Sequence, residues 1–283
     1  MGAGVSVTIA EGIARVVFDH PPINLFTFEQ FAETAGIVER LATDESVRVV
    51  VLSSANPDFF IAHFDVEAIL NFPSGEPPTT ELGPYHRMCE TLRTMPKATI
   101  AVIEGRCGGG GSELASSCDM RFASLPHGDH PGALFNQPEV ALGIIPGGSG
   151  TQRLSRLLGR SRAMEVVLGC DDIDARTAES WGWINRALPH DELWPFVVRM
   201  ARRIASFPAH AVAEAKASVL RAEKDVEADL IAEWNAFARC LGGEGTRDAM
   251  VRFLAAGGQT RDGELNLSAL FDEPGILGGF RAL

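Results

Sequence analysis

The chain has 283 residues, 46% of them hydrophobic and 22% charged, which is enough apolar material for a packed core and too little charge for a disordered chain. Its formal net charge of −12 argues against a nucleic-acid partner, because nucleic-acid binders carry an excess of lysine and arginine. Five cysteines without a C-x-x-C spacing argue against a disulfide framework and predict reduced thiols in the cytoplasm, and no apolar run is long enough to span a membrane.

Near the N-terminus, two short segments alternate apolar and polar residues. Val5–Ala10 and Ile13–Asp19 predict a β-hairpin. The segment Thr27–Leu41 has helical spacing, with its threonine in a position to cap the helix. Val47–Leu52 is a continuous apolar run, which is typical of a strand buried on both faces.

Helices and strands then alternate through the middle of the chain. Leu82–Met95 has helical spacing, and Thr99–Ile103 is a second apolar strand. The glycines Gly108–Gly111 open a helix that continues through Leu114–Ser117, and Met120–Ala123 returns as a strand. This alternation predicts an α/β fold built from repeated crossover units.

From about Ser149 onward the pattern becomes helical, and the last segments are rich in alanine, arginine, glutamate and leucine, which favour helix. The expected helices are Thr151–Leu158, Arg162–Leu168, Glu192–Ser206, Ala209–Arg221, Val226–Leu241 and Arg247–Ala255. The chain therefore divides into an α/β core over residues 1–195 and a helical C-terminal region over residues 196–283.

The run of four glycines after a buried strand is the first candidate for chemistry. Glycine lets the backbone turn sharply and approach another group closely. At the start of a helix the amide N–H groups have no partner, so such a place can hold an anion or a developing oxyanion. A tight packing turn between strand and helix explains the run equally well, and spacing alone leaves both interpretations open.

Two glutamates form the second candidate. Glu113 lies just inside the helix that the glycines open, and Glu139 follows Pro138, which suits the first turn of another helix. Either acid alone could simply stabilise a helix dipole. Together, beside an oxyanion donor, they would make a general acid/base pair.

One polar loop contains His127, Asp129 and His130. Without further clustered ligands these residues predict a solvated loop rather than a metal site, so no metal is expected.

Three segments, in this order and spacing, resemble the enoyl-CoA hydratase (crotonase) superfamily. They are Phe59-Phe60-Ile61-Ala62-His63-Phe64-Asp65, residues 105–114 with Gly108-Gly109-Gly110-Gly111-Ser112-Glu113-Leu114, and residues 136–154 with Gln137-Pro138-Glu139 and Pro146-Gly147-Gly148-Ser149-Gly150-Thr151-Gln152-Arg153-Leu154. The family patterns are F-x-A-G-A-D, N-G-x-x-x-G-G-G-x-E-L and F-x-x-P-E-x-x-x-G-x-x-P-G-x-G-G-T-Q-R-L. The resemblance extends from near the N-terminus to about residue 190.

This resemblance implies a crotonase-like α/β spiral of ββα units. The helical C-terminal region would cover the site and build a homotrimer or homohexamer. The implied partner is an acyl-CoA substrate, and no separate cofactor is expected because coenzyme A is part of the substrate.

The resemblance also assigns roles residue by residue. The family's oxyanion hole, formed by two backbone N–H groups, falls on Phe64 and Gly110, and the two catalytic glutamates of the hydratases fall on Glu113 and Glu139. The implied substrate-binding residues are Ala62, His63, Gly109, Pro138 and Gly147. A hydratase would add water across the double bond of a 2-enoyl-CoA while the enolate charge rests on the thioester oxygen.

Two residues depart from the family pattern: His63 stands where glycine is usual, and Phe64 replaces a small alanine. A backbone N–H survives any side chain, so the oxyanion hole can still form, but the phenyl ring should reshape the acyl pocket. A histidine in a tight turn is more often structural or solvent-facing than a proton donor. Basic residues that often bind coenzyme A are replaced by Val66-Glu67, which leaves a modified CoA ester or another acyl carrier open.

The leading hypothesis is a hydratase-type lyase of fatty-acid metabolism. Isomerisation, C–C hydrolysis or thioester hydrolysis would use the same oxyanion hole. An alternative of another class is a non-catalytic crotonase-like binding or assembly subunit. The departures at His63 and Phe64 favour that alternative, whereas the presence of both Glu113 and Glu139 argues against it.

Overall fold

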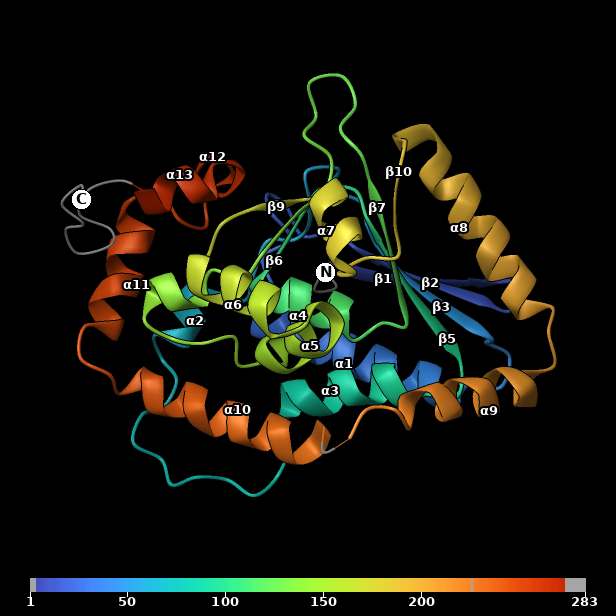
Figure 1. Ribbon diagram of the computed structural model, residues 1–283, viewed down its shortest axis with the longest axis horizontal. Coiled ribbons are helices and arrows are strands. Elements are labelled where there is room, and N and C mark those ends of the chain that lie inside the picture. Colours follow the sequence, from blue (N-terminus) through green and yellow to red (C-terminus); the bar gives the residue numbers. More distant parts are fainter. Residues whose placement is uncertain (1–3, 225, 273–283) are drawn as a thin grey trace.

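The computed structural model describes residues 4–224 and 226–272, and two β-sheets with surrounding helices make up its architecture (Figure 1). The larger sheet has the order β1-β2-β3-β5-β7-β10. Its strands are β1 (Val5–Ala10), β2 (Ile13–Phe18), β3 (Val49–Ser54), β5 (Ala98–Ile103), β7 (Met120–Ser124) and β10 (Arg186–Leu188). The first two strands form the predicted antiparallel hairpin, and the other neighbours are parallel.

A second sheet consists of very short strands in the order β4-β6-β8-β9. They are β4 (Phe59–Ile61), β6 (Arg106–Gly108), β8 (Leu134–Asn136) and β9 (Ile173–Asp174). Each of the first three follows a strand of the larger sheet and precedes a helix, namely α2 (Val66–Ile69), α4 (Gly109–Ser116) and the 3-10 helix η1 (Glu139–Leu142). This arrangement confirms the predicted α/β spiral of ββα units, although the sequence analysis predicted none of the strands of the second sheet and did not predict β10.

Strand β3 shows why the central strands are apolar throughout. Val50 and Leu52 point into the main core, whereas Val49 and Val51 pack on the other face of the sheet. There they meet Val197 and its neighbours on α8 (His190–Ala205). Because successive side chains of a strand point to opposite faces, a strand covered on both sides must be apolar at every position.

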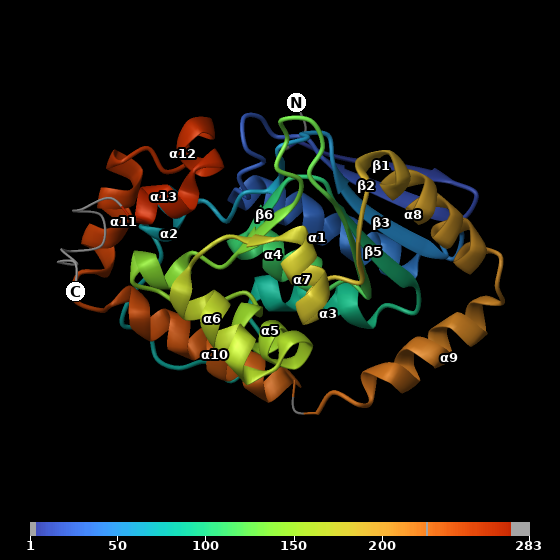
Figure 2. The same cartoon turned by 45° about the horizontal axis from the view of Figure 1, so that its top comes forward.

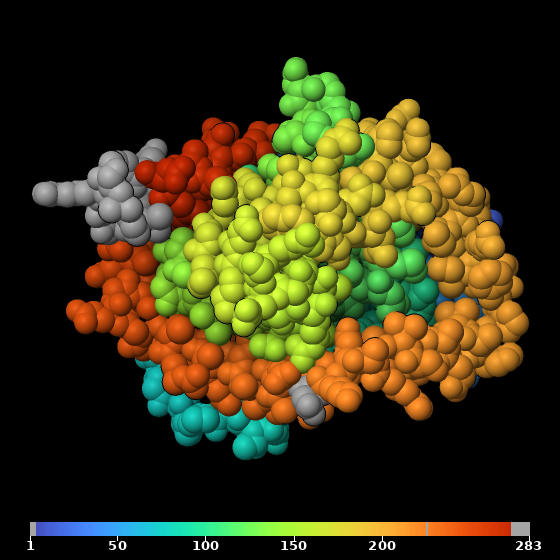
Figure 3. Space-filling view, in the orientation of Figure 1, coloured from blue at the N-terminus to red at the C-terminus, as the bar shows by residue number. Residues whose placement is uncertain are grey.

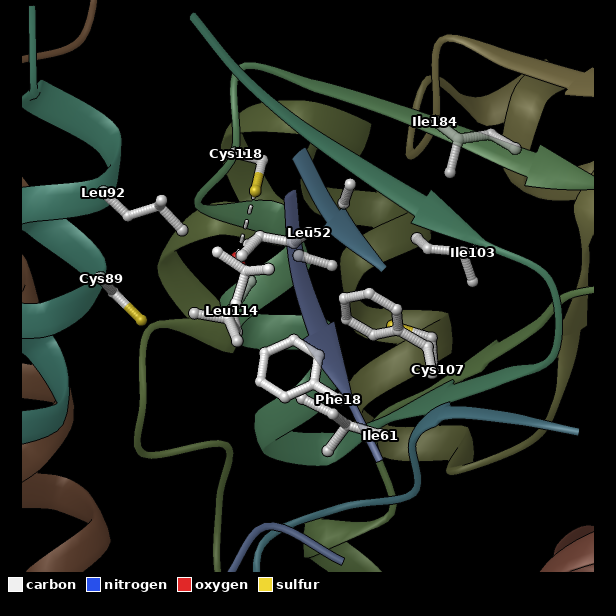
Figure 4. Packing of buried hydrophobic residues seen from close by; sticks show 14 of the residues in the cluster. Phe18, Leu52, Ile61, Cys89, Leu92, Ile103, Cys107, Leu114, Cys118 and Ile184 are labelled. Atoms are coloured by element: carbon white, nitrogen blue, oxygen red, sulfur yellow. Dashed lines mark hydrogen bonds between the residues drawn. The ribbon is translucent and has the colours of Figure 1, made fainter. Parts of the chain in front are cut away.

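The main core also contains reduced thiols. Cys89, Cys107 and Cys118 are free and buried, and Figure 4 shows them around Leu52 and Leu114. Burial raises the pKa of the Cys89 thiol to about 12, so this thiol stays protonated at neutral pH.

The helices fall into three groups: those that pack on the core face of the larger sheet, α8 and α9 beside that sheet, and the last helices of the chain. On the inner face of the larger sheet and around the second sheet are α1 (Phe28–Thr43), α3 (Pro84–Thr94), α5 (Gly150–Leu158), α6 (Arg160–Gly169) and α7 (Ala175–Trp181). Figures 1 and 2 show α8 and α9 (Ala209–Leu220) beside the larger sheet, and the last helices at the opposite end. Thr27 caps α1 by accepting a hydrogen bond from the Gln30 amide, as predicted.

The last helices are α10 (Val226–Leu241), α11 (Thr246–Ala255), α12 (Arg261–Leu265) and α13 (Leu267–Asp272). Helices α10, α11 and α13 contribute to a second apolar cluster, in which Phe237, Phe253 and Leu270 pack against Ile69 and Leu142. In Figure 3, α10 (orange) lies directly against α5 and α6 (yellow-green). None of the helices within the described ranges is both long and apolar enough to cross a lipid bilayer.

The division of the chain between residues 195 and 196 stays a prediction. The outer ends of the two regions, residues 1–3 and 273–283, lie outside the described residues.

Candidate active site

The glycine run lies where β6 passes into α4, and it brings two distant segments together. Gly109 has φ +44°, a conformation that residues with a side chain rarely adopt. A Cβ atom at this position would lie 2.9 Å from Glu139 Oε1 and 2.9 Å from His63 Cβ. Glycine is therefore required here both by the backbone angle and by the space, and the run is more than a packing turn.

The two predicted oxyanion donors lie side by side. A Cβ atom on Gly110 would lie 3.6 Å from Phe64 N. Phe64 pairs with Phe26 in a single parallel bridge, in which the amides of Phe26 and Asp65 donate and the Phe64 amide takes no part. The Gly110 amide belongs to the first turn of α4, where N–H groups have no intrahelical partner. Two backbone donors are thus positioned beside one another.

Glu113 is held rigidly inside the protein. Its side chain is buried, and Oε1 accepts hydrogen bonds from the amides of Gly148 and Gly150, each at 2.8 Å. Burial raises the pKa of Glu113 to about 8; the nearby Glu233 carboxylate also raises it, while the two amides act in the opposite direction. The carboxyl group can therefore carry a proton near neutral pH.

Glu139 is the first residue of η1, directly after the buried Pro138. Burial, and then repulsion from Glu113, raise its pKa well above the ordinary value. Gln137 bridges Glu139 and Ser112: its amide nitrogen can donate to the two carboxylate oxygens at 3.0 and 3.1 Å while its oxygen accepts from Ser112 Oγ at 3.1 Å. The two acids therefore form an interacting pair rather than two independent groups.

Both acids and both oxyanion residues line one cavity of about 340 Å³. Seven of the residues that line it are aromatic, and we call them the aromatic wall: Phe28, Phe31, Phe64, Phe72, Tyr85, Trp234 and Phe237. Of the predicted substrate-binding residues, Gly147 lines the cavity, whereas Ala62, His63, Gly109 and Pro138 are buried and are not among its lining residues. Substrate contact by those four residues stays a prediction.

His63 is structural rather than solvent-facing. Its ring is buried, with Nδ1 2.8 Å from Phe64 O and Nε2 3.0 Å from Glu264 Oε1 on α12. Both partners are hydrogen-bond acceptors, so the ring satisfies both only when both nitrogens carry protons. Burial lowers the pKa of His63, but the Glu264 carboxylate, the Phe64 carbonyl and Asp65 together outweigh that effect and raise the pKa overall. The unusual histidine thus ties the oxyanion segment to the C-terminal helices.

The sequence analysis missed Glu233, which is buried on α10. Its carboxylate accepts hydrogen bonds from the Ser149 amide at 2.7 Å and the Gln152 amide at 3.2 Å, and contacts His86 Nε2 at 3.2 Å. It therefore anchors the loop that holds Glu113. No motif marks Glu233, whereas Gln137 could have been found from its place beside the Pro-Glu pair.

Tyr85 was also missed. Its hydroxyl donates to Gly110 O at 2.5 Å, and its ring stacks on Phe31 with the ring centroids 5.7 Å apart. It therefore fixes the glycine that supplies one of the oxyanion donors. In the part of the chain that the structure describes, no group of three or more His, Cys, Asp and Glu side chains is arranged to hold a metal ion.

Comparisons with known proteins identify the family of the chain. The family model for enoyl-CoA hydratase/isomerase matches residues 8–255. A short-chain-enoyl-CoA hydratase from Clostridium acetobutylicum is 32% identical over 245 residues, which cover 86% of this chain and 91% of the relative.

Among solved structures, a candidate enoyl-CoA hydratase from Streptomyces avermitilis superposes with a TM-score of 0.85 and 37% identity, covering 96% of this chain and 98% of that one. An enoyl-CoA hydratase from Mycobacterium avium subsp. paratuberculosis gives a TM-score of 0.78 with 25% identity, covering 89% and 96%. The chain therefore belongs to the enoyl-CoA hydratase/isomerase (crotonase) superfamily.

Proposed function

We propose that the protein is a hydratase that adds water across the double bond of a 2-enoyl-CoA thioester. The observation that carries this proposal is the meeting of Glu113, Glu139 and the residues Phe64 and Gly110 on a single cavity. The similarity to hydratases over most of the chain supports it.

In the proposed reaction the thioester oxygen lies between the amides of Phe64 and Gly110. Water held by Glu113 and Glu139 adds its oxygen to Cβ, one carboxylate takes up the water proton, and Cα gains a proton from the pair. Negative charge develops on the thioester oxygen in the enolate, where each oxyanion donor is worth on the order of 3 kcal/mol.

The raised pKa values support this division of labour. Two buried carboxyl groups that repel each other's charge tend to share one proton, so one is ready to donate while the other is ready to accept. Near neutral pH, Glu113 and Glu139 would then act together as the proton donor and the proton acceptor. The proposed reaction requires no metal and no separate cofactor.

The direct test is an assay of hydration with crotonyl-CoA and longer 2-enoyl-CoA esters, in which product analysis separates hydration from isomerisation and hydrolysis. Replacing Glu113 and Glu139 together with glutamine should abolish turnover. Glu39→Gln, an exposed change on α1, is the matched control and should leave it intact. Full activity in the double variant would contradict the mechanism; no turnover and no CoA binding across the panel would favour the non-catalytic subunit.

We further propose that the protein is a cytoplasmic homotrimer or homohexamer. Helix α9 has no buried residue, and its neighbour Phe207 and its own Val219 are 45% and 72% exposed. Apolar side chains in such a position are typical of a surface that another subunit covers. Light scattering should give three or six times the mass of 30.4 kDa, and a monomer would refute the proposal.

A further inference from the structure

The cavity beside the two acids is suited to an acyl group rather than to the nucleotide or phosphates of coenzyme A. Among the residues that the structure describes, none of those lining the cavity is a lysine or an arginine, and its polar side-chain groups belong to Glu113, Glu139, Tyr85 and Trp234. The Tyr85 hydroxyl is already engaged with Gly110 O. Anionic phosphates require cationic or amide partners, so the apolar part of the substrate belongs here.

The aromatic wall offers ring edges and faces at the distances that aromatic pairs prefer. Phe64 meets Phe28 and Phe72 edge-on, with ring centroids 5.5 and 6.2 Å apart. Phe72 meets Phe237 at 6.3 Å, and Phe237 stacks on Trp234 at 5.2 Å. Aromatic pairs favour such arrangements at about 4.5–7 Å and gain about 0.5–1.5 kcal/mol beyond simple burial.

The wall is assembled from segments that hold one another in place. Phe72 belongs to the segment after α2, and Trp234 and Phe237 belong to α10. Farther along the same segment, Thr79 N donates to Asn235 Oδ1, and Asn235 Nδ2 donates to Thr79 O, each at 2.9 Å. This reciprocal pair of hydrogen bonds fixes the segment against α10, so the wall has a defined shape.

The size of the cavity also points to a ring. A cavity of roughly 150 Å³ lined by aliphatic and aromatic side chains is enough to bind benzene. The present cavity of about 340 Å³ has room for a ring and for the three-carbon enoyl unit that must reach the acids. A crotonyl group ends in a methyl and would leave much of the wall without contact.

We propose that the preferred acyl group is a 3-aryl-2-propenoyl group, whose ring packs in the aromatic wall while its double bond lies beside Glu113 and Glu139. The inference rests on the proposed hydratase function. In the reaction the Cα–Cβ π bond breaks, the water oxygen bonds to Cβ and a proton bonds to Cα, which gives a 3-hydroxy-3-arylpropanoyl thioester. No oxidant or reductant is required.

The experiment compares kcat/KM in the dehydration direction, because conjugation with the ring favours the alkene. The probes are the CoA esters of 3-hydroxy-3-phenylpropanoate, 3-hydroxybutanoate and 3-hydroxyoctanoate. We expect the phenyl ester to exceed the butanoyl ester by roughly 10- to 100-fold, as burial of a ring in place of a methyl implies. Phe72→Leu should reduce this ratio by about 10-fold, because it removes one ring of the aromatic wall. Phe196→Leu, an aromatic change on α8 remote from the cavity, should change neither.

The outcomes separate this inference from the proposed function. Fastest turnover of the butanoyl or octanoyl ester would overturn the aryl preference and leave the hydratase proposal in place. No turnover of any ester would refute the hydratase proposal. In that case calorimetric binding of the phenyl and butanoyl esters decides the question, and equal affinities would overturn the aryl preference as well.

Discussion

Replacing Glu113 with glutamine tests how much the ionisation of this buried carboxyl group costs in folding stability, separately from its role in catalysis. Glutamine keeps an oxygen that can accept from the amides of Gly148 and Gly150, which lie 2.8 Å from the native Oε1. It cannot ionise, however. Any change in the stability of the variant therefore reports mainly on the cost of a buried negative charge.

The sign follows from the raised pKa of Glu113. In an unfolded chain the carboxyl group releases its proton near the ordinary glutamate pKa of 4.5, whereas in the folded chain it keeps the proton to about pH 8. As pH rises between these values the unfolded state gains by ionising, so the stability that the neutral carboxyl group confers is lost progressively. A difference of roughly three pH units at about 1.4 kcal/mol per unit corresponds to roughly 3–5 kcal/mol.

Urea denaturation of the wild type and Glu113→Gln, at one protein concentration because assembly shifts apparent stability, measures this effect. At pH 5 the two free energies of unfolding should agree within about 1 kcal/mol. At pH 8.5 the variant should be more stable by roughly 3–5 kcal/mol, while its turnover falls at least 100-fold. A difference that does not change with pH, or a variant less stable at pH 8.5, would refute the reasoning. The exposed Glu39→Gln is the control.

Three further predictions concern the same site. Turnover should decline as pH rises past about 8, because burial raises the pKa of Glu113 to that value and its carboxyl group then loses its proton; a flat pH–rate profile to pH 10 would contradict this. Folding raises the pKa of His63 above 6.5 and lowers that of Glu264 below 4.5, so the stability from their ion pair is complete between these values and is lost as pH rises through the raised pKa of His63. Glu264→Gln should accordingly cost about 1.5–3 kcal/mol in urea denaturation at pH 6 and less at pH 9, and an equal cost at both would refute the assignment. Gly109→Ala should lower kcat/KM at least about 10-fold, because its Cβ would lie 2.9 Å from Glu139 Oε1, and unchanged kinetics would show that the site tolerates displacement.

The sequence predicted the elements whose pattern is long enough to carry a period. The helices α1 and α10 and the hairpin β1–β2 fall within a few residues of their expected bounds. Strands β4, β6, β8 and β9 have only two or three residues each, and their identity depends on pairing with strands far away in the chain. No local pattern can reveal such strands.

The site shows the same contrast. Glu113 and Glu139 could be found because residue type and spacing mark them, and the resemblance to the family assigned them a role. Glu233 lies 84 residues from Ser149, and Glu264 lies 201 residues from His63, so these contacts depend on how the C-terminal helices dock. Docking of this kind is decided by packing and not by motifs.

Helix α10 combines two tasks that protein engineers usually treat separately. Trp234 and Phe237 shape the acyl cavity, while the adjacent Glu233 anchors the loop that holds Glu113. A chimera that takes this helix from a relative to change specificity would also exchange the anchor, and with it the alignment of the acid. Acyl specificity and the position of Glu113 therefore depend on the same helix. A grafted helix preserves activity only if it carries an equivalent carboxylate at the position of Glu233.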